Sequence, residues 1–301
     1  MSSLIKISKV DKHFENVHAL KGVSMCIRRG SIYGLVGTNG SGKTTILKHI
    51  TGIIRPDSGS ITLDGKAVYE NTIVKQRICF VPDELFFFGN YNLCDMRRLF
   101  AGMYRTWNQQ RFDALVSAFG LDRKKKITRF SKGMQKQAAF TLAISAMPDV
   151  LILDEPVDGL DPIVRRTVWD IIVNDVAERQ MTVIISSHNL KEIEGICDTV
   201  GILSNGELVL ERELDDLKSN IHKVQVAFAK PQTEPYGKLN ILSRTTVGSV
   251  DMLIIRNSAE EIEAAISPYD PLILDMLPLT LEEIFIYELG GEKNEYSSII
   301  S

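Results

Sequence analysis

Long apolar stretches are absent from this 301-residue chain, although 44% of its residues are hydrophobic. No stretch approaches the roughly 20 apolar residues that a membrane-spanning helix needs, which argues against an integral membrane protein. The first residues also lack the apolar run of a signal peptide. We therefore expect a soluble, cytoplasmic protein with a large buried core. Such a protein would act on a membrane only through a partner.

Cysteine is scarce, and basic charge is not in excess. The four cysteines are far apart and form no Cys-x-x-Cys pair, which argues against a disulfide framework or a zinc site and favours a reducing compartment. The chain has 35 Lys and Arg against 38 Asp and Glu, a net charge of −3. That balance argues against a chain-wide nucleic-acid-binding surface. Internal repeats and low-complexity tracts are absent too.

The middle of the chain alternates between apolar strands and helical patterns. Val150–Leu153, Thr182–Ser186 and Thr199–Leu203 are separated in this way, which is typical of a mostly parallel sheet in an α/β fold. Residues 4–36 predict short strands separated by turns. Residues from about 85 to 147 show helical patterns throughout, which predicts a helical insertion into the α/β core.

The character of the chain changes past about residue 212. Possible strands are followed by Ser258 and Thr280, each with a glutamate three residues later, which is the capping-box signature of a helix start. We therefore expect three parts: a main domain over 1–215, a small α+β domain over 216–291 and a flexible tail over 292–301.

A glycine-rich loop follows an apolar strand and precedes a helical pattern: Gly37-Thr38-Asn39-Gly40-Ser41-Gly42-Lys43-Thr44. Its glycines let backbone N–H groups approach phosphate oxygens at a helix N-terminus, whose partial positive charge favours an anion. We expect Lys43 to reach the β- and γ-phosphates of a nucleotide and Thr44 to hold Mg²⁺. The candidate nucleotide-binding residues here are Gly37, Asn39, Gly40, Ser41, Gly42, Lys43, Thr44 and Thr45.

Two acidic residues, Asp154 and Glu155, come at the end of the apolar strand Val150–Leu153. The carboxyl ends of strands are where ligands bind in α/β sheets. We expect Asp154 to serve Mg²⁺, directly or through water, and Glu155 to deprotonate or orient the water that attacks the γ-phosphate. Such a pair is also common as a loop start or helix cap, but the upstream phosphate loop favours the catalytic interpretation.

Three further motifs lie downstream: Phe130-Ser131-Lys132-Gly133-Met134, Gly159-Leu160-Asp161, and His188 at the end of a strand. With the loop and the acidic pair, they resemble the signature, D-loop and switch histidine of ABC ATPase nucleotide-binding domains, over about residues 1–215. The resemblance implies a P-loop NTPase core of ABC type with an antiparallel β subdomain and a helical insertion. It implies nucleotide contacts for Ser131, Gly133 and Asp161, and γ-phosphate sensing for His188.

The resemblance also assigns Phe14 to stacking on adenine, although a half-buried strand residue is the alternative. Two motifs depart from the family, at three positions. Asp83 replaces its glutamine after the Ile78–Pro82 strand; a carboxylate could contact Mg²⁺, but it adds negative charge and donates no hydrogen bond. Lys132 and Met134 replace Gly and Gln in the signature, a variant similar to single-domain ATPases of bacterial exporters of the bacitracin and multidrug type.

In that family two domains dimerise head to tail, with each ATP between the phosphate loop of one and the signature of the other. The resemblance therefore implies a homodimer, or a heterodimer with a related ATPase, that binds ATP and Mg²⁺. It also implies a separate integral membrane permease as partner, with the chain peripheral on the inner face of the cell membrane. The run Phe86-Phe87-Phe88 is a candidate permease contact, although ordinary packing within the insertion explains it at least as well.

Two other functions stay open: a soluble ABC ATPase that acts on the ribosome or nucleic acid, and a non-transport regulatory ATP binder. The single domain and the lack of a heptad run weigh against the first, and no nucleic-acid partner is expected. Glu155 and His188 weigh against the second. The expected function is thus an ATPase that powers export of a drug, peptide or other small compound, whose identity the membrane subunits would determine.

Overall fold

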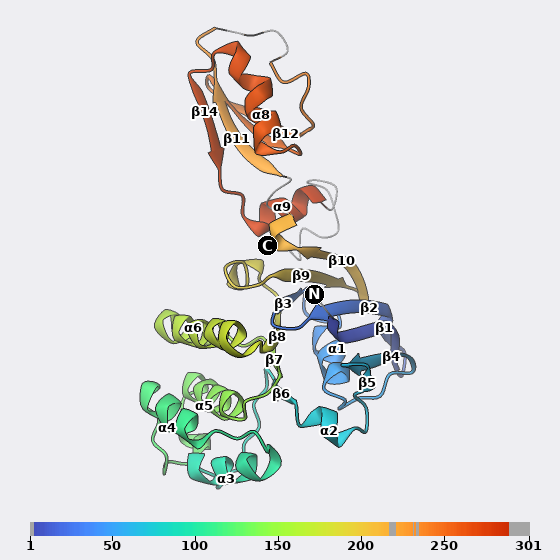
Figure 1. Cartoon of the computed structure of the whole chain (residues 1–301), viewed down its shortest axis with the longest axis vertical. Helices are drawn as coiled ribbons and strands as arrows, with labels where there is room; N and C mark the ends of the chain where they lie inside the picture. The colour runs from blue at the N-terminus through green and yellow to red at the C-terminus, as the bar shows by residue number, and fades with distance from the viewer. Residues whose placement is uncertain (1–2, 217–220, 231, 233–234, 289–301) are drawn as a thin grey trace. The chain divides into compact units, whose positions relative to one another are not determined.

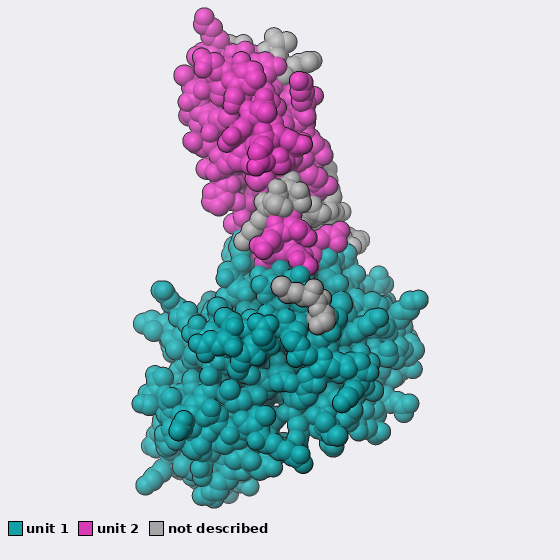
Figure 2. All heavy atoms as spheres, in the orientation of Figure 1, with its two compact units in different colours: residues 1–211 teal, residues 212–301 magenta. Residues whose placement is uncertain are grey.

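The computed structural model describes residues 3–216, 221–230, 232 and 235–288. The chain divides into two compact units, residues 1–211 and 212–301, which Figure 2 shows in teal and magenta. The tail predicted over 292–301 lies outside the described residues. Among the helices described, none combines the length and the apolar character needed to cross a bilayer.

A six-stranded sheet forms the centre of the first unit, in the order β10-β9-β3-β8-β7-β6. Its strands are β3 (Ile32–Val36), β6 (Ile78–Val81), β7 (Val150–Asp154), β8 (Thr182–Ser187), β9 (Thr199–Ser204) and β10 (Glu207–Glu213). The pairs β3–β8, β3–β9, β6–β7 and β7–β8 are parallel. Every residue of β3, β7 and β8 is buried, as expected for central strands covered on both faces. The carboxyl ends of these three neighbouring strands therefore lie at one edge of the sheet.

An antiparallel sheet accompanies the central one in the first unit. It consists of β1 (Ser3–Phe14), β2 (Val17–Arg28), β4 (Ser58–Leu63) and β5 (Lys66–Ala67), in the order β2-β1-β4-β5. Helix α1 (Lys43–Ile50) packs its apolar face into a core shared by both sheets (Figure 1). The short helix α2 (Thr72–Lys75) precedes β6. The helix that follows the glycine-rich loop thus packs against both sheets.

The insertion contains α3 (Leu93–Met103), α4 (Gln109–Ala118), the 3₁₀ turn η1 (Ile127–Arg129) and α5 (Lys132–Ser145). Each helix begins where a side chain accepts a hydrogen bond from the first turn: Asn92, Asn108 and Ser131. The prediction of helix from residue 85 is wrong at its start, because residues 85–91 form no helix. Helix α6 (Pro162–Arg179) and the turn η2 (Leu190–Glu192) complete the unit.

The second unit is an antiparallel sheet with helices. Its strands are β11 (His222–Ala227), β12 (Ile241–Val247), β13 (Val250–Ile255) and β14 (Ile273–Leu277), in the order β12-β13-β11-β14. Its helices are α8 (Ala259–Ile266), the 3₁₀ turn η3 (Ser267–Tyr269) and α9 (Leu281–Glu288). Both predicted capping boxes form: the Ser258 and Thr280 hydroxyls accept hydrogen bonds from the backbone N–H groups of Glu261 and Glu283 at 3.3 and 3.2 Å.

Candidate nucleotide site

A pocket of about 780 Å³ lies in the first unit beside the glycine-rich loop. This volume lies within the range of small-molecule and cofactor sites. Its lining comprises Phe14, Val17, His18, Ala19, Lys21, Thr38, Asn39, Gly40, Gly42, Lys43, Thr44, Thr45, Asp83, Glu155, Asn205 and Gly206. The structure thus brings Phe14 and Asp83, predicted from distant parts of the chain, to the predicted loop.

Two wall segments were not predicted from the sequence. Residues 17–21 begin β2, directly after the turn that follows Phe14, so their closeness in sequence to Phe14 could have suggested them. Asn205 and Gly206 form the turn between β9 and β10, with φ angles of 49° and 82°. The Asn-Gly pair is a strong hairpin signal, but nothing in the sequence places that turn beside the glycine-rich loop.

Two glycines of the loop are required by close approach and by backbone conformation. A Cβ atom at Gly37 would lie 2.3 Å from the Leu203 carbonyl oxygen. Gly42 has a φ of 107°, and a Cβ atom there would lie 2.8 Å from the Ala19 carbonyl oxygen. Within the described chain no side chain caps α1 at Gly42, so the amides of its first turn are available to an anion. Ser41 is buried behind them.

The Lys43 ammonium is buried and turned back onto the loop. It donates hydrogen bonds to the carbonyl oxygens of Gly37 and Thr38, at 2.6 and 3.3 Å. It also lies 3.2 Å from Oε1 of Glu155. That contact is an ion pair without hydrogen-bond geometry, because Oε1 is buried and makes no hydrogen bond among the described residues. The ammonium therefore lies between the loop and the Glu155 carboxylate.

Thr44 and Asp154, two residues predicted to serve Mg²⁺, come into direct contact, and their binding of that ion stays a prediction. The Thr44 hydroxyl donates a hydrogen bond of 2.7 Å to Asp154 Oδ2, and the Ser186 hydroxyl donates one of 2.5 Å to Oδ1. Asp154 is 2% exposed. A buried carboxylate whose hydrogen-bond donors are hydroxyls offers the hard oxygen ligands that Mg²⁺ prefers. Ser186, on β8, was not predicted, and its role depends on the pairing of β7 with β8.

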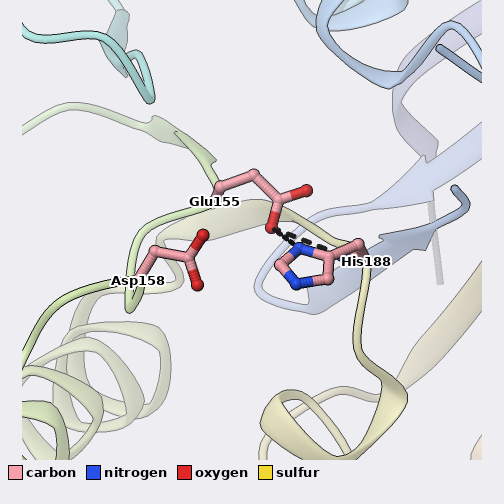
Figure 3. Close-up of side chains that lie close together, drawn as sticks. All are labelled: Glu155, Asp158 and His188. Carbon is pink, nitrogen blue, oxygen red and sulfur yellow. Dashed lines mark hydrogen bonds and ion pairs between the residues drawn. The ribbon is translucent and has the colours of Figure 1, made fainter. Parts of the chain in front are cut away.

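Glu155 and His188 face one another at the ends of β7 and β8, as Figure 3 shows. Oε2 of Glu155 lies 2.8 Å from Nδ1 of His188 and accepts a hydrogen bond from its backbone N–H at 3.3 Å. The hydrogen bond to Glu155 raises the pKa of His188, although partial burial opposes the rise. Asp158, which the sequence did not single out, places a carboxylate oxygen near both. One carboxylate oxygen each from Glu155 and Asp158 and one ring nitrogen of His188 all lie within 4.8 Å of one another.

Asp83 lies in the same pocket, but its nearest cation comes from the helical insertion. Lys136 Nζ lies 3.6 Å from Asp83 Oδ1 and donates a hydrogen bond of 2.8 Å to the Glu155 carbonyl oxygen. Burial raises the pKa of Asp83, and the charges of Asp154 and Glu155 raise it further, whereas Lys136 opposes the rise. Lys136 follows the signature by two residues, yet nothing in the sequence indicated these contacts.

Ser131, Gly133 and Asp161 do not line the pocket of their own chain. The Ser131 hydroxyl accepts a hydrogen bond from the Met134 N–H at the start of α5. The Asp161 carboxylate likewise caps α6, and a Cβ atom at Gly133 would lie 3.4 Å from the Gly159 carbonyl oxygen. Their predicted role toward a nucleotide on a second chain stays a prediction.

Phe14 is 42% exposed at the end of β1, and the Lys12 ammonium lies 5.4 Å from the centre of its ring. An exposed ring on a pocket wall is available for stacking on a planar ligand. The ring lines the pocket that contains the glycine-rich loop, and its predicted contact with adenine stays a prediction.

Comparison with known proteins identifies the family. Residues 20–158 match the family model described as ABC transporter. The ABC transporter ATP-binding protein YtrB of Bacillus subtilis (strain 168) is 33% identical over 290 residues, which cover 96% of this chain and 99% of that protein. The bacitracin transport ATP-binding protein BcrA of Bacillus licheniformis is 33% identical over 226 residues, 74% of each chain.

A solved structure of an ATP binding subunit of an ABC transporter matches with a TM-score of 0.68 and 26% identity, over 72% of this chain and 92% of that one. The chain therefore belongs to the ABC transporter ATP-binding proteins. The predicted fold is confirmed: the first unit is a P-loop NTPase cassette with an antiparallel β subdomain. The predicted activity, that of an ATPase, is confirmed as well.

Proposed function

We propose that this ATPase powers a separate integral membrane permease and that the transporter exports a drug, a peptide or another small compound. The observation that carries the proposal is the convergence of Lys43, Thr44, Asp154, Glu155 and His188 at the carboxyl ends of three neighbouring strands. The relative whose name refers to bacitracin transport supports the substrate class.

Lys43 and the loop amides would bind the β- and γ-phosphates. The carbonyl oxygens that now accept from Lys43 are neutral, so an entering phosphate would compete well for the ammonium. Thr44 and Asp154, with Asp83 nearby, would hold Mg²⁺, which supplies neutralisation of phosphate charge when bound. Their hydroxyl and carboxylate oxygens fit that ion, because they already approach to 2.7 Å at a buried point.

Glu155 would act as the general base. When Lys43 turns toward a phosphate, Oε1 of Glu155 loses its ion-pair partner and becomes free to take a proton from water. The water oxygen then attacks the γ-phosphorus, and the bond between that phosphorus and the β-γ bridging oxygen breaks to release ADP. His188 holds the carboxylate by its other oxygen, and its ring would donate a hydrogen bond to the γ-phosphate.

Each ATP would lie between two cassettes. The position of Ser131, Gly133 and Asp161 outside their own pocket supports this, because these residues could serve a second chain, either another copy or a related ATPase. ATP would favour the closed dimer, and hydrolysis would favour its opening.

An exposed aromatic cluster in the insertion would contact the permease on the inner face of the membrane. Phe86 is 82% exposed and Phe88 47%, and their ring centres are 5.9 Å apart. The Tyr91 ring lies tilted against that of Phe88, with centres 4.8 Å apart. Phe87 instead packs against the core of the insertion, so the run divides between packing and exposure. A contiguous exposed aromatic cluster is typical of an interaction site.

The experiment is to purify the tagged chain from its native cells in mild detergent and to identify what accompanies it. A stoichiometric integral membrane protein that is lost in the Phe86→Ser/Phe88→Ser variant would support the proposal. The matched control is Val173→Ser, another exposed apolar position, on α6. Recovery of ribosomes or nucleic acid, without a membrane protein, would contradict it and favour the soluble ATPase alternative.

A further inference from the structure

We infer that Lys136 is a positioning residue for ATP hydrolysis, which holds the main chain of Glu155 and compensates the charge of Asp83. The inference rests on the proposed catalytic role of Glu155. It assigns one ammonium group two separable tasks, one in turnover and one in ATP binding.

The Lys136 side chain is only 12% exposed, although lysine ordinarily keeps its ammonium in water. The described contacts of its Nζ atom are the Glu155 carbonyl oxygen at 2.8 Å and the Asp83 carboxylate at 3.6 Å. Both partners belong to the site edge of the sheet, whereas Lys136 belongs to α5 of the insertion. A buried ammonium needs such partners, and here both lie next to the hydrolysis site.

The backbone of Glu155 needs to be held, because it is in a conformation that residues with a side chain disfavour. Its φ is 45°, in the left-handed region. The N–H of Glu155 donates to the Ser186 hydroxyl at 3.1 Å, and its carbonyl accepts from Lys136. The two bonds fix the peptide groups on both sides of the Cα atom. The orientation of the Glu155 carboxylate toward His188 and Lys43 depends on that fixed backbone.

Asp83 presents a half-exposed carboxylate to the pocket that contains Lys43 and Thr44. Its charge adds to those of Asp154, Glu155 and Asp158, against the ammonium groups of Lys43 and Lys136. Without Lys136, the Asp83 charge would act on a polyphosphate with little compensation. The charge of Lys136 therefore favours ATP binding, and its hydrogen bond to Glu155 favours turnover.

The test measures kcat for ATP hydrolysis and the ATP dissociation constant, by calorimetric titration, for a set of variants. Lys136→Met should lower kcat about tenfold, the equivalent of one lost charge-assisted hydrogen bond, and should weaken ATP binding about fivefold. Asp83→Asn in the Lys136→Met background should restore ATP binding but not kcat. Lys136→Arg should keep both near the wild-type values, since its guanidinium can make both contacts.

The matched control is Lys124→Met, which removes an exposed ammonium from the same insertion and should change neither quantity. Wild-type kcat in Lys136→Met would overturn the positioning role, and failure of Asp83→Asn to restore binding would overturn the charge role.

If Lys136→Met does not fold, Lys136→Gln takes its place, because glutamine keeps a hydrogen-bond donor but no charge. Lys136→Gln should lower ATP affinity more than kcat; equal losses would overturn the inference. Glu155→Gln is assayed in parallel: normal turnover there would contradict the proposed function itself, whereas an inactive Glu155→Gln beside a fully active Lys136→Met would contradict this inference alone.

Discussion

Asp175 offers a sharp test of how the helical insertion is fastened to the cassette. Its carboxylate is 2% exposed on α6 and accepts from two arginines. One is Arg111 of α4, within the insertion, and the other is Arg179, whose Nε and terminal nitrogen lie 3.1 and 3.0 Å away. Asp175→Asn keeps the shape of the side chain and removes the charge that joins the two helices.

The expected loss of stability is about 3 kcal/mol. Removing one partner from a buried ion pair typically costs about 3–5 kcal/mol, because a charge is left unpaired. The two arginine side chains are 26% and 20% exposed. Since water can partly rehydrate both, the lower end of the range applies. With a urea dependence of about 2.5 kcal/mol/M, the midpoint of unfolding should fall by about 1.2 M.

The assay is urea unfolding followed by tryptophan fluorescence. Both tryptophans of the chain lie in the first unit, Trp107 in the insertion and Trp169 on α6, so the signal reports the unit that is perturbed. The matched control is Asp113→Asn, which breaks the exposed pair with Arg123 and should cost less than about 1 kcal/mol. A midpoint for Asp175→Asn no lower than that of the control would refute the reasoning.

Three further predictions concern the nucleotide site. Lys43→Ala should weaken ATP binding about 100-fold in a calorimetric titration, because the loop loses its cation; unchanged affinity would contradict the phosphate-loop assignment. Thr44→Val should raise the Mg²⁺ concentration for half-maximal hydrolysis about tenfold, and wild-type Mg²⁺ dependence would count against that ligand. In Glu155→Gln the pKa of His188, followed by NMR of its ring, should fall toward its ordinary value of about 6.5, and an unshifted titration would contradict the observed pairing. Because the pKa of His188 is raised in the folded state, its contact with Glu155 stabilises the wild-type protein below about pH 6.5. That stabilisation is lost as the pH rises through the raised pKa. The difference in Tm between the wild type and Glu155→Gln should therefore shrink over that interval.

Local patterns explain which parts of the site could be predicted. The glycine-rich loop and the strand that ends in Asp154 each carry their chemistry within a few neighbouring residues. The loop and the acidic residues come together because the carboxyl ends of parallel strands lie at one edge of the sheet. The 2.7 Å contact between Thr44 and Asp154 is therefore a consequence of topology. Capping boxes at Ser258 and Thr280 were equally local, and both form.

The remaining features depend on contacts between segments that are distant in the sequence. Ser186 and Lys136 reach Asp154 and Glu155 from β8 and α5, and no periodicity or spacing reports such a contact. The segment 85–91 was included in the predicted helical stretch but forms no helix, because α3 begins only at Leu93, after the cap at Asn92. Strand β14 (Ile273–Leu277) was not predicted, although Asp270-Pro271 and Pro278 bound it, because only Asp275 interrupts its short apolar run.

The measurement that tests the central claim most directly compares Glu155→Gln with the wild type for ATP binding, ATP turnover and mass in solution. Glu155→Gln should retain ATP affinity and form a stable dimer with ATP. Its turnover should fall at least about 100-fold, as expected for loss of a general base. Normal turnover in this variant would show that the carboxylate between Lys43 and His188 is not the catalytic base and would contradict the account of the site.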